Sequence, residues 1–328
     1  MSARRFDFSS TAEEVSEGLD LSGRLALITG GASGLGSETA RVLALRGARV
    51  VIAARDMAKA DAAIAAILAD LPTADLEAMQ LDLADLDSVR AFAVLFAREH
   101  PRLDLLIANA GVMASPPGKT ADGFDLQFGT NHLGHFVLVN RLHGPLKAAA
   151  DAGRKPRVVV LSSRAHRRAD VDLDDPNFEA RPYDKWQAYG ESKTANALFA
   201  LELDRRWRAD GIRAFSVHPG GIVTELGRHL TDEDRAALLE RFQKAGAAPQ
   251  FKSVPQGAAT TVFAATAPEL DGEGGYYLEN AARAARNVDM ESDRPEQQGA
   301  GVAGYAQDPD RAARLWALSE GLVRESFS

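Results

Sequence analysis

The stretch LALITGGASGLG, residues 25–36, decides the fold. A short apolar run, residues 25–29, leads into a glycine-rich turn, and the helical sequence SETARVLALRG follows and ends at Gly47. Glycines between a strand and a helix let the backbone approach a pyrophosphate, and the helix N-terminus offers free N–H groups and a positive dipole end. The G-x-x-x-G-x-G spacing of Gly30, Gly34 and Gly36 departs from the G-x-G-x-x-G fingerprint, and no Lys-Ser/Thr follows as in a P-loop nucleotidase. We therefore predict a dinucleotide-binding turn.

Short apolar strands alternate with helical sequence beyond this turn. The predicted strands are RVVIAA (49–54), LEAMQLDL (76–83), LDLLIANAG (103–111), RVVVLSS (157–163) and IRAFSVHPGG (212–221), with GGYYLEN (274–280) as a last edge strand. Strands this apolar are typical of a parallel sheet that is buried on both faces. The pattern predicts a single α/β domain with a doubly wound parallel sheet, a Rossmann fold flanked by helices. Alanines and leucines in helical residues 57–70 and 195–203 are interpreted as core faces.

The sequence divides the chain into a Rossmann domain with an extension at each end. Residues 1–21 are predicted to be an extension with a short helix over 10–18, because Ser10–Glu13 and Thr11–Glu14 form capping-box patterns. Residues 22–282 form the Rossmann domain, in which the polar segment 225–255 is expected to cover the substrate. Its charged run DEDRAALLER (232–241) is interpreted as a solvated helix. Residues 283–328 are predicted to be an irregular stretch, to 304, and a terminal helix that begins at Asp308-Pro309 and packs on the domain.

Composition narrows the function classes. The chain has 328 residues, 45% hydrophobic and 26% charged, and its net charge of −8 argues against a nucleic-acid or anionic-membrane partner. It contains no cysteine, which excludes disulfides, thiolate metal sites and redox thiols. Arg4 and Arg5 are not followed by the apolar stretch of a signal peptide, and no run approaches 18 apolar residues. We expect a soluble, cytoplasmic protein without a membrane partner.

With the glycine turn, further motifs resemble the short-chain dehydrogenase/reductase family. They are "LDL" after the third strand, "ANAG" after the fourth, "NHLGHF", "VVVLSS", "YGESK" and "HPGGIVT", in the family's order over about residues 22–280. The resemblance implies four catalytic residues: Asn131, Ser163, Tyr189 and Lys193. It also implies a cofactor site formed by Thr29, Gly30, Ser33, Gly34, Leu35, Gly36, Asp82, Leu83, Asn109, Ala110, Gly111, Tyr189, Lys193, Pro219, Gly220, Ile222 and Thr224.

The chain is most similar to the branch that contains the retinol dehydrogenases and the WW-domain oxidoreductase. The segment 164–188 between Ser163 and Tyr189 is about twice the usual family interval, and "SSRAH", "TNHLGHF" and "YGESKTANALFA" carry this likeness. Retinoid specificity is not carried over, because no membrane segment is visible. Segments 164–188 and 225–255 follow strand ends, where open α/β sheets bind ligands. Either they roof a deep pocket for a bulky apolar substrate, or they are surface decoration or subunit contacts; a homo-oligomer stays open.

The resemblance implies hydride transfer between an alcohol or carbonyl substrate and a nicotinamide, with Tyr189 as proton donor or acceptor. The Lys193 ammonium is expected to lower the tyrosine pKa and to hold the nicotinamide ribose. The Ser163 hydroxyl is expected to donate to the substrate oxygen, and Asn131 to anchor a relay water. The mechanism needs no imidazole, and no metal-ligand spacing is visible; of the neighbouring histidines, His166 is expected to touch substrate.

The end of the second strand bears on the choice of cofactor. Ala54 stands where an NAD-dependent protein is expected to have an acidic residue, and Arg55 follows it. Because a guanidinium binds phosphate through a planar fork of donors, Arg55 predicts NADP, while Asp56 keeps NAD open. Two other functions fit the motifs less well. An extended-branch epimerase or dehydratase spaces its glycines G-x-x-G-x-x-G, unlike this chain. An idle dinucleotide-binding sensor or scaffold is disfavoured because Ser163, Tyr189 and Lys193 are all present.

Overall fold

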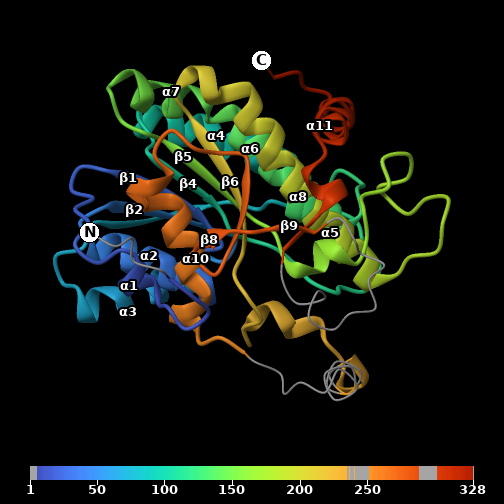
Figure 1. The fold of residues 1–328 in the computed structure, drawn as a ribbon, viewed down its shortest axis with the longest axis horizontal. Helices are drawn as coiled ribbons and strands as arrows, with labels where there is room; N and C mark the ends of the chain where they lie inside the picture. The colour runs from blue at the N-terminus through green and yellow to red at the C-terminus, as the bar shows by residue number, and fades with distance from the viewer. Residues whose placement is uncertain (1–5, 235, 237–239, 241–250, 288–300, 328) are drawn as a thin grey trace.

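The computed structural model describes residues 6–234, 236, 240, 251–287 and 301–327. Eight strands form one sheet in the order β3-β2-β1-β4-β5-β6-β7-β8, parallel throughout except for β8 (Figure 1). The strands are β1 Leu25–Thr29, β2 Arg49–Ala54, β3 Leu76–Gln80, β4 Leu105–Ala108, β5 Arg157–Leu161, β6 Arg213–His218, β7 Tyr276–Glu279 and β8 Ala282–Arg283. The chain runs outward from β1 to β3 and then returns to β4, so the switch point of the sheet lies between β1 and β4.

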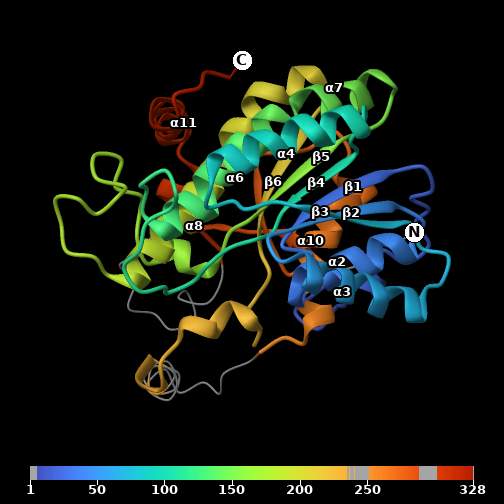
Figure 2. The ribbon, with the colours of Figure 1, turned by 180° about the vertical axis from the view of Figure 1, so that it is seen from behind.

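Helices cover both faces of this sheet. One face carries α1 (Ala12–Val15), α2 (Gly34–Leu45), α3 (Met57–Asp70) and α10 (Val254–Thr266); the other carries α4 (Leu86–Glu99), α5 (Leu126–Phe128), α6 (Gly134–Arg141), α7 (His143–Asp151) and α8 (Lys185–Trp207). Figures 1 and 2 show these two layers, with α11 (Pro309–Val323) outside α8. Among the described residues, no helix is both long enough and apolar enough to span a bilayer.

Alternating side chains explain why the strands are apolar along their whole length. In β1, Leu27 packs into the core under α4, α6 and α8, whereas Ala26 and Ile28 pack into the core under α2 and α10. All three side chains are fully buried. Because successive side chains of a strand point to opposite faces, a sheet with helices on both sides needs apolar residues at every position. The prediction of a doubly wound parallel sheet is confirmed.

The N-terminal and middle helices differ in part from their predictions. The helix expected over 10–18 is only Ala12–Val15: Thr11 and Glu14 form the capping box, whereas Ser10 accepts a hydrogen bond from the Asp7 N–H instead. In α3 only Ala60 and Ile67 are buried and several alanines face solvent, so its core face is narrow. Residues 195–203, in contrast, are buried apart from Leu201, as predicted.

Three expectations concern the last third of the chain. The predicted edge strand, β7, is not at the edge, because β8 pairs with it antiparallel after a tight turn. The stretch expected to be irregular contains β9 (Arg286–Asn287) and β10 (Val302–Ala303), which pair with each other. Much of segment 225–255, and of the helix expected over 232–241, lies outside the described residues. The terminal helix begins after the Asp308 cap with Pro309 in its first turn, as predicted.

Candidate active site

The glycine turn after β1 lies against the segment after β6. A Cβ atom on Gly34 would lie 3.5 Å from the Thr224 side chain. A Cβ on Gly257 of α10 would lie 2.7 Å from both Leu35 and Ile222, so these two side chains meet over that glycine. The cofactor segments expected after β1 and β6 are therefore brought together at the carboxyl edge of the sheet, where open α/β sheets bind ligands.

Close backbone packing explains the glycines of the turn. A Cβ on Gly36 would lie 2.3 Å from the Gly30 carbonyl oxygen, and one on Gly30, whose φ is +67°, would lie 2.9 Å from the Ala110 Cα. Gly31, which the expected cofactor site did not include, packs just as closely on Ile52. Ser33 makes no side-chain cap at the start of α2, and the first turn of that helix has no acidic residue. The N–H groups and positive end of α2 thus suit a pyrophosphate.

The ends of β2, β3 and β4 carry the other expected cofactor residues. Asn109 donates from Nδ2 to the carbonyls of Thr29 and Gly30, at 2.9 and 3.2 Å, and so ties β4 to the glycine turn. Asp82 accepts from the Ala84 N–H at 2.9 Å, which shapes the turn after β3. Arg55 is exposed after β2, whereas Asp56 is the N-cap of α3 and accepts from the Lys59 N–H at 3.1 Å.

The remaining members of the expected cofactor site lie beside these residues. Leu83 is buried at 6% exposure, and a Cβ on Gly134 would lie 2.4 Å from its carbonyl oxygen, so α6 starts directly against the turn that follows β3. After β6, Gly220 has a φ of +106° and packs on the Lys252 side chain, which turns the backbone that follows Pro219. Both segments border the carboxyl edge of the sheet.

Tyr189 lies near the start of α8 with only 5% of its surface exposed. Burial raises the pKa of its hydroxyl to about 12, and a hydrogen bond with Ser163 offsets part of that rise. This direction is opposite to the lowering expected from Lys193, because desolvation disfavours the phenolate more than the protein favours it. The hydroxyl is therefore protonated at neutral pH.

Lys193 lies one helical turn after Tyr189 and is 4% exposed. Its Nζ donates to the Leu161 carbonyl at the end of β5, at 3.0 Å, and lies 5.7 Å from the centre of the Tyr189 ring. Burial lowers the pKa of this ammonium to about 8. A Cβ on Gly111 would lie 3.6 Å from Nζ, so the end of the "ANAG" motif borders the lysine.

Asn131 lies in a π-helical turn, Gly129–Leu133, and is fully buried. Its Oδ1 accepts from the Val112 N–H at 2.8 Å, and its Nδ2 donates to the Val112 carbonyl and to the Ser192 hydroxyl, both at 2.9 Å. The amide group is thus bonded to the chain itself, and a relay water would have to be held by the backbone carbonyl. Ser192, next to Lys193, was not identified by sequence reasoning.

The structure does not support the expected contact of His166 with substrate. The side chain is fully buried, its Nδ1 donates to the Ser163 carbonyl at 2.6 Å, and its Nε2 accepts from the Ala303 N–H at 3.1 Å. Both ring nitrogens are therefore occupied by backbone groups. Burial lowers the pKa of His166 to about 4, so the ring is neutral at physiological pH. His166 holds the Ser163 backbone and links it to β10.

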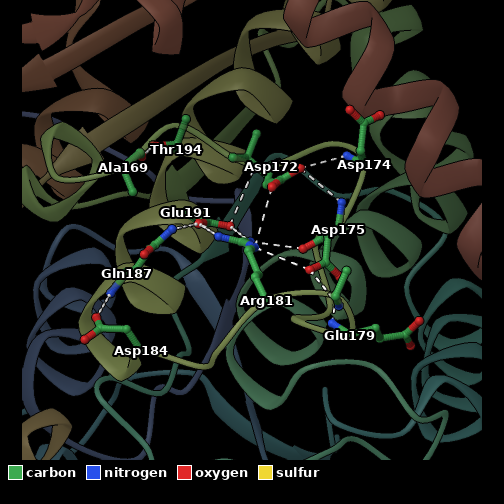
Figure 3. Close-up of polar contacts among 12 residues, drawn as sticks. Ala169, Asp172, Asp174, Asp175, Glu179, Arg181, Asp184, Gln187, Glu191 and Thr194 are labelled. Carbon is green, nitrogen blue, oxygen red and sulfur yellow. Dashed lines mark hydrogen bonds and ion pairs between the residues drawn. The ribbon is translucent and has the colours of Figure 1, made fainter.

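The long segment 164–188 is anchored on α8 by one arginine. Arg181 donates to both carboxylate oxygens of Glu191, each at 2.6 Å, and its Nε lies 3.5 Å from Asp172 and from Asp175 (Figure 3). The Phe178 ring stacks on the guanidinium at 3.9 Å. Glu191 is 3% exposed and stands between Tyr189 and Lys193 in α8. The ion pair thus fixes the segment to the helix that carries both residues.

The described residues contain one group that could hold a metal ion, outside this site. Glu77, Glu99 and His100 place donor atoms within 4.8 Å of one another. Arg49 already pairs with Glu77 at 2.8 Å, and Arg98 with Glu99 at 3.3 Å. The three residues lie on β3 and at the end of α4, away from the carboxyl edge of the sheet, so they are separate from the site around Tyr189.

Comparison with known proteins identifies the family. The family model described as "short chain dehydrogenase" matches residues 24–235, which is more than half of the chain. A "Probable oxidoreductase" of Streptomyces antibioticus is 42% identical over 93% of this chain and 99% of its own length. The human WW domain-containing oxidoreductase is 39% identical over 98% of this chain and 73% of its own length. A crystal structure of an uncharacterised protein from Mycobacterium paratuberculosis, 36% identical, covers 96% of this chain and 98% of its own with a TM-score of 0.71.

The chain therefore belongs to the short-chain dehydrogenase/reductase family and is an oxidoreductase of that family.

Proposed function

We propose that the protein interconverts an alcohol and a carbonyl with a nicotinamide dinucleotide, and that Tyr189 exchanges the proton. The observation that carries this proposal is the group at the carboxyl edge of the sheet. The Tyr189 hydroxyl is hydrogen-bonded to Ser163, and the Lys193 ammonium lies one turn along the same helix. The glycine turn and the open start of α2 fit a dinucleotide beside this group.

When bound, the nicotinamide supplies or accepts the hydride. In the reductive direction, the substrate oxygen would take its proton from the Tyr189 hydroxyl. A pKa of about 12 keeps this hydroxyl protonated and ready to donate at neutral pH. Ser163 donates a hydrogen bond to the substrate oxygen while negative charge develops there. Lys193 stabilises the tyrosinate until a proton returns from solvent, and the reverse sequence oxidises the alcohol.

The proposed substrate is bulky and largely apolar. Val223, between the expected cofactor residues Ile222 and Thr224, exposes 74% of its surface, and Phe251, within segment 225–255, exposes 51%. Exposed apolar side chains beside a proposed reaction centre are suited to contact an apolar ligand. We propose that segment 164–188, which Arg181 fixes to α8, also borders the substrate. A screen in which short aldehydes give the highest kcat/KM would contradict this part.

The proposed cofactor is NADP(H). Arg55 is exposed at the end of β2, available to a 2′-phosphate, and the preceding Ala54 carries no carboxylate that would repel one. Asp56, the residue that keeps NAD(H) as the alternative, is bonded to the first turn of α3. A role as an idle dinucleotide-binding sensor or scaffold is the other alternative, and turnover of any substrate in the screen separates it from an enzyme.

Replacing Tyr189 by phenylalanine tests the chemistry. A screen of alcohols and carbonyls, followed by nicotinamide absorbance, first identifies a substrate for the purified protein. We expect Tyr189→Phe to lose at least about 10²-fold in kcat, a typical contribution of a general acid or base. Cofactor affinity, measured by fluorescence titration, should change little. Tyr276→Phe removes a hydroxyl from β7 outside the site and is the matched control. Near-normal turnover of Tyr189→Phe would falsify the assignment.

A further inference from the structure

A fully buried histidine connects the cofactor turn to the catalytic asparagine. His135 Nε2 lies 2.8 Å from the Thr29 hydroxyl at the end of β1, and His135 Nδ1 lies 2.9 Å from the Asn131 backbone carbonyl. Thr29, Asn131 and His135 are each at most 1% exposed, so these bonds are shielded from bulk solvent. The side chain thus joins two parts of the site that lie about 100 positions apart in the sequence.

The neighbours of Thr29 determine which ring nitrogen carries the hydrogen. The Thr29 hydroxyl oxygen accepts from the N–H groups of Asn109 and Ala110, at 3.0 and 3.1 Å, and these two bonds use both of its lone pairs. Its own hydrogen must therefore be donated. The acceptors in reach are His135 Nε2 at 2.8 Å and the Ile107 carbonyl at 3.5 Å, and the shorter contact is the stronger bond.

His135 Nε2 is therefore an acceptor, and the ring hydrogen is on Nδ1, which donates to the Asn131 carbonyl. Burial lowers the pKa of His135 to about 4, so this neutral form holds across the physiological pH range. The hydrogen bonds run in one direction, from the backbone after β4, through Thr29 and the ring, to Asn131.

The Asn131 carbonyl is a position where a side-chain donor matters. Asn131 belongs to the π-helical turn, in which the Gly134 N–H bonds the Gly129 carbonyl five residues back before the α-helical pattern resumes in α6. Such turns interrupt the regular i to i+4 ladder and are frequent at functional sites. His135, four residues after Asn131, supplies a donor from its ring at this interruption.

Asn131 is also placed to transmit a displacement to Lys193. Its Nδ2 donates to the Ser192 hydroxyl, one residue before Lys193. A Cβ on Gly111 would lie 3.0 Å from the Asn131 side-chain oxygen and 3.6 Å from Lys193 Nζ, so the two groups flank the same glycine. A shift of the Asn131 backbone would therefore also displace the Lys193 ammonium group.

We propose that His135 is a positioning residue, which fixes the Asn131 carbonyl relative to the dinucleotide turn and so couples cofactor seating to the proton relay of Tyr189 and Lys193. The kinetic consequence rests on the proposed function, whereas the hydrogen-bond chain does not. Two experiments separate these parts.

The first experiment determines which ring nitrogen of His135 carries the hydrogen in the cofactor-free protein. With ¹⁵N-labelled histidine, we expect the NMR signals of His135 to show a protonated Nδ1 and an unprotonated, hydrogen-bonded Nε2, unchanged between about pH 5.5 and 8. The signals are assigned by their loss in a His135 variant or, if that variant does not fold, by contacts with Thr29 in the wild type. Protonation at Nε2, or titration near the ordinary histidine pKa, overturns the proposal whatever the enzyme does.

The second experiment compares two variants, each of which retains one of the two hydrogen bonds of the His135 ring. The amide of asparagine reaches the Nδ1 position and that of glutamine reaches the Nε2 position. His135→Asn keeps a donor to the Asn131 carbonyl and loses Thr29, so kcat should stay close to wild type while the cofactor KM rises. His135→Gln keeps Thr29 and loses the donor to Asn131, so kcat should fall about 10- to 100-fold, the effect of a small misplacement, with the cofactor KM little changed.

His132→Gln is the matched control, since His132 is another buried histidine, bonded at 2.8 Å to the Ser319 hydroxyl of α11 and not to the site. It should lower stability without this split between kcat and KM. If kcat falls and the cofactor KM rises together in both His135 variants, His135 has only a structural role. The same holds if neither constant changes more than it does in His132→Gln. If Tyr189→Phe is also fully active, the proposed function fails instead, and the NMR result still stands.

Discussion

Lys193 holds an ammonium group where water hardly reaches, and this placement carries a thermodynamic cost. Among the described residues, its Nζ makes one hydrogen bond, to the Leu161 carbonyl, although an ammonium has three donors. Burial lowers its pKa from 10.5 to about 8, which means that folding disfavours the charged form. The group proposed to stabilise the tyrosinate therefore destabilises the cofactor-free fold.

We expect Lys193→Met to abolish turnover and to raise the free energy of unfolding of the cofactor-free protein by about 2 kcal/mol at pH 7, somewhat less than the full pKa shift implies. Leu161 keeps a donor in the variant, because Asn196 Nδ2 also bonds its carbonyl at 2.9 Å. Between pH 8 and 10.5 the unfolded wild-type chain binds more protons than the folded one. The free energy of unfolding of the wild type therefore rises toward that of the variant as the pH rises through this range. Urea denaturation at pH 7 and 9.5 measures both values. If the stability difference between Lys193→Met and the wild type does not shrink at pH 9.5, burial of the ammonium is not its cause. An equal increase in the free energy of unfolding from Lys59→Met, at an exposed position, would argue the same way.

Two neighbouring positions at the end of β2, Ala54 and Arg55, are expected to decide between the two cofactors. A charge-assisted hydrogen bond from Arg55 to a 2′-phosphate is worth about 1.5–3 kcal/mol, or roughly 10- to 150-fold in binding. We expect the wild type to prefer NADP(H), and Ala54→Asp with Arg55→Ala to shift kcat/KM toward NAD(H), because a carboxylate repels the phosphate and can bond the free hydroxyl. Measuring kcat/KM with both cofactors in both proteins is the test. A wild type that already prefers NADH would make Asp56 the residue to replace.

At the scale of elements, α8 carries Tyr189 and Lys193 on one side and the long segment 164–188 on the other. Glu191 makes this double role possible, because its carboxylate binds both terminal nitrogens of Arg181 and also accepts from Gln187 Nε2 at 2.9 Å (Figure 3). The Thr194 hydroxyl adds bonds to the carbonyls of His166 and Ala169. The segment is therefore attached to the helix at several points, and Arg181 is the centre of the attachment.

We expect Glu191→Gln to lower the free energy of unfolding by about 2 kcal/mol, below the range for fully buried pairs because Arg181 is partly exposed. Hydrogen exchange should rise in residues 170–183 more than in the strands. Glu179→Gln removes the same charge from an exposed side chain of the same segment, shown in Figure 3, and should leave exchange unchanged. Equal exchange in the two variants would mean that Arg181 does not hold the segment.

The strands, and the gathering of the candidate site residues at one edge of the sheet, were predictable because their signals are local. Each strand is a short apolar run that ends at turn residues, and the expected cofactor residues follow strand ends, which a parallel sheet gathers at one edge. Features that depend on distant contacts were missed. Nothing near His135 in the sequence indicates Thr29, and the π-helical turn has no periodic signature in five residues. The bond of His166 to the Ala303 N–H could not be predicted either, because the two residues lie 137 positions apart in the sequence.

At the scale of the whole molecule, the terminal helix α11 completes the core beside α8. Trp316 is 2% exposed and its ring meets Phe136 of α6 edge-on at 5.0 Å and lies 5.9 Å from Phe199 of α8. Arg206 of α8 covers its outer face at 4.3 Å. A helix that packs on the outside of α8 in this way should unfold together with the rest of the chain.

Replacing Trp316 tests this expectation. We expect Trp316→Ala to lower the free energy of unfolding by about 3–5 kcal/mol, the usual cost of emptying a large aromatic site, and Trp316→Phe to lower it much less. Both variants should still unfold in one transition, with coincident midpoints by circular dichroism and by the fluorescence of the remaining tryptophans. An early, separate loss of helical signal in Trp316→Ala, with the fluorescence midpoint unchanged, would show that α11 is not part of the cooperative unit. In that case α8 keeps its position without α11, and turnover should survive the substitution.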